Sequence, residues 1–413
     1  MKIPAMRWLI SIAVFLPLEG ANAQVYDFTA VTQLLNDHLD LYRGNVLVVM
    51  SQDDREIYRY EAGSIGEDTR IPIASATKWL SGTIILKLAE LGHFGLDDRV
   101  GDYLPVLEEQ GKGDITIRQC FAMKSGLVET NEAYVTDALL TLEESVNLIA
   151  SNTPVVFTPG TQLAYDGAGM QVVGRVAEVV TGKDWRTLAS EVLFEPVGMT
   201  NCNYNGFALN PAVAGGARCP PAAYLRFLDM IMDNGGTPSG GVLLASSSIQ
   251  EFFRNQTEEL PEYYAPWPPS FLYPNRQRPD YGMGSWIMAQ NPTSRVVEEV
   301  SSPGAFGTFP WVDRKRHVRG AIFMLGLDGF ADTVYNNLRI LNAIRSEIDS
   351  EGLPPLGPPD ILTPSVVGNY LSYGISQGLS DENTDHRPPG PWRASSVGHT
   401  YRLRSPYDPE GAP

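Results

Sequence analysis

The spacing of hydrophobic residues predicts strands at both ends of the chain. Apolar residues recur at helical spacing over residues 28–41, and two strand patterns follow at 45–50 and 56–60, joined by a turn at Asp53-Asp54. An apolar stretch at 71–75 then leads into a long helical pattern at 76–91. The later strand patterns cover residues 281–289, 295–301, 308–312 and 318–325, and a closing helical pattern covers 333–348.

Short helices separated by Pro/Gly-rich loops fill the middle of the chain. The helical patterns cover residues 141–151, 169–180, 185–193 and 221–233. Because strands at the two ends bury their apolar faces by pairing, we expect one antiparallel sheet flanked by helices, with residues 90–275 as an inserted all-helical lobe. This predicts an α/β plus all-α fold over residues 24–350, with a substrate cleft between the two lobes.

The two termini have a different composition. Lys2 and Arg7 give a basic start, an apolar run covers residues 8–18, and Ala-Asn-Ala at 21–23 matches a signal-peptidase site. We therefore expect residues 1–23 to be a signal peptide and the protein to be exported, periplasmic or secreted; an uncleaved anchor is the alternative. No stretch reaches the roughly 18 apolar residues of a membrane-spanning helix. Residues 351–413 are rich in Pro, Gly and polar residues and are expected to form a surface tail.

Composition limits the partners. The chain has 413 residues, 43% hydrophobic and 19% charged, as is typical of globular proteins. Its net charge of -17 repels phosphate backbones, so no nucleic-acid partner is expected. Five histidines lie apart, without the spacing of metal ligands, so no metal or other cofactor is expected.

Three cysteines lie in the mature part of an exported protein, where disulfides persist. Cys202 and Cys219 flank a loop-like stretch rich in Asn, Gly and Pro and are close enough in sequence to close a short disulfide. Cys120 lies in a helical pattern and is expected to be a buried thiol. The count of cysteines does not fix their connectivity, so this pairing remains a hypothesis.

Ser75 and Lys78 form the only S-x-x-K spacing in the chain. This motif lies where a strand-like stretch turns into a helix, so the serine hydroxyl is expected near unpaired N–H groups, with the lysine one turn later on the same face. Burial lowers the pKa of a lysine, and a neutral amine can accept the serine proton. A helix cap followed by a surface lysine explains the same residues, so this motif alone does not decide the function.

Two more segments carry candidate chemistry. Tyr165 precedes a helix that begins with glycines, and its hydroxyl can reach into a cleft; a core tyrosine at a helix entry is the alternative. Residues 301–308 place small side chains on a strand, where a substrate can approach the backbone. A free N–H in this segment, together with that of Ser75, would form an oxyanion hole. A bulged strand edge is the alternative.

The order and spacing of these three motifs resemble the serine β-lactamase and penicillin-binding-protein superfamily. The closest branch contains class C β-lactamases, D-alanyl-D-alanine carboxypeptidases and esterases. The likeness extends from about residue 45 to residue 348. Supporting stretches are T-I-R-Q at 116–119, S-G-L at 125–127, F-T-P-G at 157–160 and T-F-P-W-V-D at 308–313.

The resemblance implies a sheet lobe and a helical lobe with the site between them. It implies that Ser75 is the nucleophile and that Lys78 and Tyr165 share proton transfer. It also implies that the N–H of Ala305, after the third-motif glycine Gly304, completes the oxyanion hole with the N–H of Ser75.

Two positions depart from the family pattern and affect the expected substrate. Gly167 replaces the asparagine of Tyr-x-Asn, and Ser302 replaces the cation of Lys-Thr-Gly or His-x-Gly; with Gly304 these are the candidate substrate-binding positions. Replacing a charged contact with a hydroxyl weakens carboxylate binding by about 1–3 kcal/mol. Arg314 or Arg316 could supply the charge instead.

We therefore expect a serine hydrolase that acts on a small uncharged ester, with amides as a further substrate class. β-Lactamase or D-Ala-D-Ala peptidase activity is one alternative. A non-catalytic binding protein that keeps the fold is another, and the changes at Gly167 and Ser302 favour it, whereas the intact Ser75, Lys78 and Tyr165 oppose it. A Ser-His-Asp hydrolase would need a G-x-S-x-G turn and a well-placed late histidine, and it ranks lower.

Overall fold

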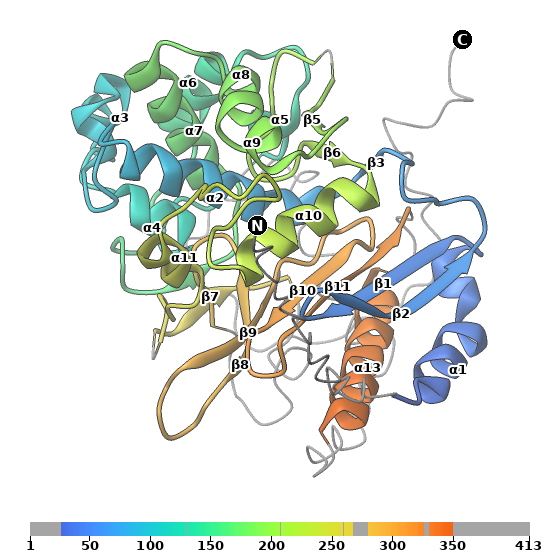
Figure 1. Ribbon diagram of the computed structural model, residues 1–413. Helices are drawn as coiled ribbons and strands as arrows, with labels where there is room; N and C mark the ends of the chain where they lie inside the picture. Colours follow the sequence, from blue (N-terminus) through green and yellow to red (C-terminus); the bar gives the residue numbers. More distant parts are fainter. Residues whose placement is uncertain are drawn as a thin grey trace, which may run out of the picture.

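Six antiparallel strands form the central sheet of this computed structural model (Figure 1), in the order β2-β1-β11-β10-β9-β8. Strands from the beginning of the chain lie beside strands from its end, which confirms the predicted fold class. The structure describes residues 26–129, 131–206, 208–258, 260–266, 280–325 and 330–349. The expected signal peptide and C-terminal tail lie outside these residues. The strands are β1 (Val46–Gln52), β2 (Arg55–Ala62), β8 (Trp286–Gln290), β9 (Val297–Ser301), β10 (Phe309–Asp313) and β11 (Val318–Met324).

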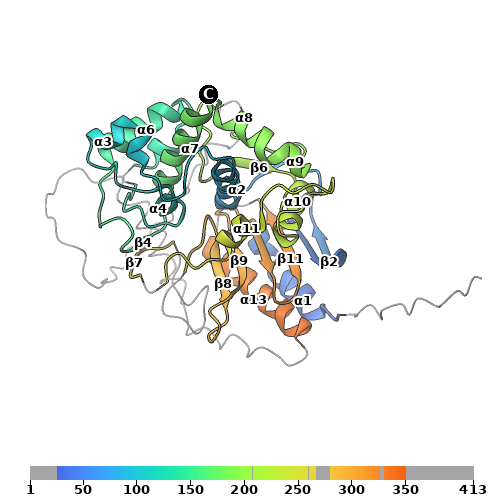
Figure 2. The ribbon, with the colours of Figure 1, turned by 60° about the vertical axis from the view of Figure 1, so that its left-hand side comes forward.

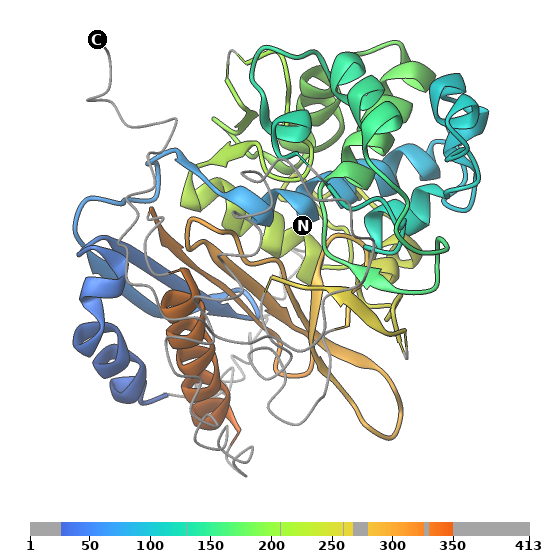
Figure 3. The ribbon, with the colours of Figure 1, turned by 180° about the vertical axis from the view of Figure 1, so that it is seen from behind.

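Helices cover both faces of this sheet. Every residue of β11 is buried, as are the first five of β1, because each strand packs against helices on its two sides. Helices α1 (Thr29–Asp37) and α13 (Phe330–Ile348) lie side by side on one face, as Figure 3 shows. Helix α10 (Pro221–Met232) packs against β10 and β11 on the other face.

The helical lobe lies beyond α10, at one side of the sheet. Helix α2 (Thr77–Glu90) runs between this lobe and the sheet (Figure 2), and eleven of its 14 residues are buried, including Trp79 and Ile84. A helix that is apolar on all sides is typical of the centre of a protein. The other helices of the lobe are α3 (Pro105–Glu109), α4 (Ile117–Phe121), α5 (Ala133–Thr136), α6 (Leu142–Asn152), α7 (Ala168–Thr181), α8 (Trp185–Ala189), α9 (Glu195–Val197) and α11 (Ser246–Phe252).

The structure differs from the predicted elements in several places. The helix predicted at residues 185–193 ends as α8 at Ala189 and continues as a π-helical turn. The strand predicted from residue 281 begins only at Trp286, because Gly284 turns the chain with φ of +83°. Two small sheets were not predicted; one of their strands lies in the strand-like stretch at 71–75, but the others are two or three residues long and carry no periodicity. They consist of β3 (Ile71–Pro72), β6 (Ala217–Cys219) and β5 (Asn203–Tyr204), and of β4 (Leu163–Ala164) and β7 (Glu262–Tyr264).

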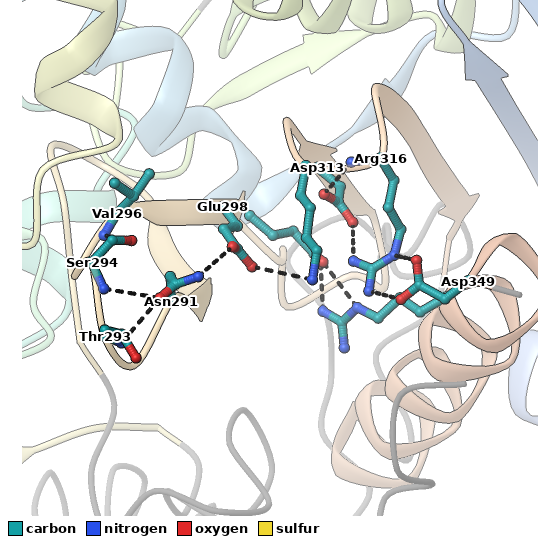
Figure 4. Close-up of polar contacts among 11 residues, drawn as sticks. Asn291, Thr293, Ser294, Val296, Glu298, Asp313, Arg316 and Asp349 are labelled. Carbon is teal, nitrogen blue, oxygen red and sulfur yellow. Dashed lines mark hydrogen bonds and ion pairs between the residues drawn. The ribbon is translucent and has the colours of Figure 1, made fainter. Parts of the chain in front are cut away.

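Ion pairs fasten the closing helix to the sheet. Arg316, in the turn after β10, contacts Asp313 at 2.6 Å and also pairs with Asp349 just after α13 (Figure 4). Arg345 of α13 donates two hydrogen bonds, at 2.6 and 2.9 Å, to the fully buried Glu299 of β9. Removing one partner of such a buried pair typically costs about 3–5 kcal/mol, because the other charge stays buried. These contacts therefore hold α13 against this face of the sheet.

A disulfide closes the segment between β5 and β6. The structure places Cys202 and Cys219 in this bond, with Cα atoms 4.3 Å apart, and leaves Cys120 as a buried thiol. The bond constrains the loop between the two cysteines, in which residues 210–216 approach the start of α2. Among the described helices, none is both long and apolar enough to cross a bilayer.

Candidate active site

Ser75 lies at the junction between the small sheet and α2. Strand β3 pairs with β6, and a single 3-10 turn over Ala74–Ala76 then leads into the helix. Ala74 has φ of +45°, a left-handed conformation that costs a non-glycine residue about 1 kcal/mol. Such strain persists only where surrounding contacts hold it, and Ala217 supplies two: its carbonyl accepts from Ile73 N at 3.1 Å and its N–H donates to Thr77 Oγ1 at 3.1 Å.

Lys78 lies one helical turn after Ser75 and is buried. Its Nζ is 3.0 Å from Ser75 Oγ and 3.0 Å from the carbonyl oxygen of Ala214. Burial lowers the pKa of Lys78 from 10.5 to about 8, although the nearby Asp166 and Glu129 partly oppose this shift. The amine therefore loses its proton far more readily than a surface lysine.

The loop of residues 210–216 fixes the carbonyl that Lys78 contacts. Gln171 of α7 accepts from Val213 N at 3.0 Å and donates to Asn210 Oδ1 at 2.6 Å. Ser81, one turn after Lys78 on α2, donates to the Val213 carbonyl at 2.6 Å. This buried network holds the backbone at Ala214 against the lysine.

Tyr165 follows β4 and lies directly against Lys78. Lys78 Nζ is 4.7 Å from the centre of its ring, and the ring stacks on Trp286 at 5.0 Å and meets Tyr281 edge-on at 5.9 Å. Burial raises the pKa of Tyr165, and hydrogen bonds with Ser75 and Trp286 partly oppose this rise. The phenol therefore keeps its proton at neutral pH and can donate it.

The third motif, residues 301–308, lies beside the backbone of the turn that contains Ser75. Ser302 Oγ donates to the carbonyl oxygen of Ser75 at 2.9 Å, and Ser302 is 1% exposed. A Cβ on Gly304 would come within 2.1 Å of the Ile73 carbonyl, so only glycine permits this approach. Ala305 follows in the exposed turn. Its N–H and that of Ser75 have no hydrogen-bond partner within the described ranges.

Two carboxyl groups lie near Lys78, those of Asp166 and Glu129. Asp166 accepts the N–H groups of Glu129 at 2.8 Å and Ala168 at 2.6 Å. Gly167 has a φ of -101°, and a Cβ there would fit in ordinary van der Waals contact, 3.4 Å from the side chains of Ala214 and Val135 and 4.0 Å from Glu129 Oε2. The position that lacks a side chain is therefore bordered by a carboxyl group from another segment.

The arginines that could replace the missing cation lie elsewhere. Arg314 stacks on Phe253, with its guanidinium 3.6 Å from the ring centre, and donates to Asn234. Arg316 is held by Asp313 and Asp349, at the end of β10 remote from the third motif. Neither one supplies a charge next to Ser302.

Several residues that contact Lys78 or Tyr165 lie outside the three sequence motifs. Ala214, Glu129, Tyr281 and Trp286 reach Lys78 or Tyr165 from segments far away in sequence. Ala214 and Glu129 belong to no predicted element, and the strand predicted over residues 281–289 gives no indication that Tyr281 and Trp286 contact the site. The one G-x-S-x-G spacing, at residues 374–378, lies outside the described residues. In the described part of the chain, no group of three or more His, Cys, Asp or Glu is placed to hold a metal ion.

The fold and the site together define a two-lobed protein with a buried serine–lysine–tyrosine cluster at the junction of its lobes. Such a cluster can supply a nucleophile, a base and a proton donor. A model of the beta-lactamase family matches residues 32–344, and the chain belongs to this family.

Known proteins of similar sequence and fold agree with this membership. A putative beta-lactamase from Bacteroides dorei is 26% identical, with a TM-score of 0.72 over 78% of this chain and 99% of that one. EstCE1, a hydrolase with promiscuous acyltransferase activity, shares the fold at 15% identity, with a TM-score of 0.59 over 74% of this chain and 96% of that one. Penicillin-binding protein 4 of Amycolatopsis lactamdurans is 25% identical over 151 residues, which span 35% of this chain and 38% of that relative's length.

Proposed function

We propose that this chain is an exported serine hydrolase that forms an acyl-enzyme on Ser75 and acts on small uncharged esters. The observation that carries the proposal is the 3.0 Å contact between Ser75 Oγ and the buried amine of Lys78. With a pKa of about 8, roughly one lysine in ten is neutral at pH 7, against about one in three thousand at the ordinary value of 10.5. Lys78 is therefore the base of this site.

The proposed reaction has two halves. Neutral Lys78 takes the hydroxyl proton as Ser75 Oγ attacks the ester carbonyl carbon, and the N–H groups of Ser75 and Ala305 receive the developing oxyanion. The bond between the carbonyl carbon and the alcohol oxygen then breaks, and Tyr165 gives its proton to the departing alkoxide. In the second half, the Tyr165 phenolate takes a proton from the water that attacks the acyl carbon. The bond between that carbon and Ser75 Oγ then breaks, and protonated Lys78 returns its proton to Ser75 Oγ, which releases the carboxylic acid.

The substrate preference rests on Ser302 and its neighbours. Its hydroxyl is engaged with the Ser75 carbonyl, the next residue, Pro303, has no N–H, and Arg314 and Arg316 are held elsewhere. Among the described residues, an anionic substrate therefore finds no cation at this motif, whereas a neutral ester needs none. EstCE1, a hydrolase with promiscuous acyltransferase activity, has the same fold, which supports acyl transfer as the chemistry of the proposal.

We expect kcat/KM for p-nitrophenyl acetate or butyrate to exceed that for nitrocefin by at least about tenfold, since an anion anchor contributes about 1–3 kcal/mol. Steady-state kinetics on both substrates measure this ratio. A preference for nitrocefin would overturn the ester proposal in favour of a β-lactamase. Ser302→Ala is the control: a hydroxyl that only positions Ser75 affects both substrates equally, whereas one that binds a carboxylate affects nitrocefin alone.

Export is part of the proposal, and the disulfide between Cys202 and Cys219 supports it because such bonds persist in oxidising compartments. We expect the mature protein to begin at Gln24, after the Ala-Asn-Ala site. N-terminal sequencing of protein purified from an exporting host checks this. Protein that retains Met1 and remains in the cytosolic fraction contradicts export.

A further inference from the structure

Two fully buried aromatic residues enclose Tyr165, and the proposed reaction gives them no role. Trp286, the first residue of β8, stacks on the Tyr165 ring, with the ring centres 5.0 Å apart and the planes at 23°. Tyr281 meets the Tyr165 ring edge-on at 5.9 Å and meets Trp286 edge-on at 4.8 Å. The three rings therefore form a closed cluster in which each ring contacts the other two.

A tight turn holds the two enclosing rings against the site. Tyr281 and Trp286 form an antiparallel bridge at the ends of the turn over residues 282–285. Gly284 in this turn has φ of +83°, and a Cβ there would come within 2.4 Å of the Lys78 carbonyl oxygen. Only glycine permits so close an approach. The turn therefore lies directly on the backbone of α2 at the residue that supplies the base.

The direction of the Tyr165 ring matters for the chemistry. Lys78 Nζ lies 4.7 Å from its centre, and its hydroxyl is hydrogen-bonded with Ser75. The direction of a tyrosine hydroxyl depends on two side-chain torsions, and neighbouring rings that restrict both torsions fix it. A displacement of about 1 Å from the productive geometry can cost about 10²-fold in rate. Packing around the ring is therefore a means of controlling proton transfer.

We propose that Trp286, supported by Tyr281, is a positioning residue that holds the Tyr165 hydroxyl towards the departing alkoxide, an inference that rests on the proposed serine–lysine reaction. In that reaction the bond between carbonyl carbon and alcohol oxygen breaks, the electron pair stays on the oxygen, and the Tyr165 O–H supplies the proton. p-Nitrophenolate is a stable anion at neutral pH and leaves without this proton, whereas ethoxide must receive it. Trp286 therefore determines whether the enzyme acts on alkyl esters as well as on activated esters.

The test compares kcat/KM for ethyl butyrate with kcat/KM for p-nitrophenyl butyrate, two substrates that give the same acyl-enzyme. In Trp286→Leu we expect the ratio of ethyl to p-nitrophenyl ester to fall by about 10–100-fold, because a displaced phenol fails only the substrate that needs its proton. Labelling of Ser75 by a fluorophosphonate, which expels fluoride, should stay close to the wild-type rate. Trp286→Phe keeps a stacking face and should restore most of the ratio.

A double-mutant comparison asks whether Trp286 acts through Tyr165. Tyr165→Phe should lower the same ratio, and adding Trp286→Leu to it should lower the ratio no further, since both changes remove one function. Trp311→Leu is the matched control. Trp311 of β10 is also buried but packs over Gly320 of the sheet, so its ratio should equal that of the wild type.

Tyr281→Leu removes the edge contact and carries the same expectation, which keeps the test decisive if Trp286→Leu does not fold. Each of four results overturns the inference and leaves the proposed function intact: a wild-type ratio in the folded Leu variants, a ratio as low in Trp286→Phe as in Trp286→Leu, a further fall in the double mutant, or a wild-type enzyme that hydrolyses only the p-nitrophenyl ester. A wild-type protein that fluorophosphonate does not label at Ser75 overturns both.

Discussion

Replacing Ser75 with alanine should abolish hydrolysis and remove the covalent adduct with a fluorophosphonate. The hydroxyl of Ser75 is held 3.0 Å from Lys78 Nζ, and a further hydrogen bond joins it to Tyr165. Neither neighbour replaces it as a nucleophile, since Lys78 is buried and Tyr165 keeps its proton. Loss of a nucleophile typically costs about 10⁴–10⁶-fold in kcat. Intact-protein mass spectrometry and an ester assay measure the two effects.

The control for this variant is Ser247→Ala, on the exposed side of α11, which should hydrolyse and label like the wild type. Turnover that survives in Ser75→Ala would place the nucleophile elsewhere. A wild-type protein that is folded, fails to label and hydrolyses nothing would instead favour a binding protein with this fold.

Replacing Lys78 with methionine should lower kcat/KM by about 10²–10⁴-fold, the usual contribution of a general base. Lys78→Arg should be equally impaired, because a guanidinium keeps its proton at any working pH and cannot accept one from Ser75. Activity in the wild type should rise as the pH passes through about 8, where the amine becomes neutral. Steady-state kinetics between pH 6 and 10, a range set by this pKa, follow both effects.

Lys112→Met is the control for Lys78→Met. Burial also lowers the pKa of Lys112, but its amine contacts the Ile149 carbonyl, outside the serine–lysine site. This variant should keep the wild-type rate. Activity retained in Lys78→Arg would show that the site needs a positive charge at this position and would remove Lys78 as the base.

The sequence predicts those parts of the site that depend on local geometry. Ser75 and Lys78 are three residues apart at the start of a helix, and one turn of helix brings such residues together whatever surrounds them. The strands β1 and β11 are predicted for a similar reason, since short apolar runs bounded by turn residues identify buried strands. Local patterns also gave the position of α2, to within one residue at each end.

Contacts between segments that are distant in sequence cannot be predicted from local patterns. Ala214 lies 136 residues after Lys78, and Glu129 reaches the site from a loop whose sequence has no motif. The direction of the Ser302 side chain also depends on tertiary structure: the sequence suggests a substrate contact, whereas the hydroxyl donates to the Ser75 carbonyl. The late start of β8 follows from Gly284, whose approach to the Lys78 carbonyl depends on packing between the two lobes.

The pairing of β1 with β11 has a consequence for how the chain folds. Val46 lies opposite Met324, so the central pair of strands closes a loop that contains the whole helical lobe. Closing so long a loop is entropically costly before other contacts form, and sheets built from distant strands fold slowly. The helical segments between the strands can form early from local contacts, but the third motif reaches Ser75 only when β9 to β11 join β1. An emerging chain therefore carries Ser75 and Lys78 long before it can complete the oxyanion hole, and hydrolytic activity should appear with the last step of folding.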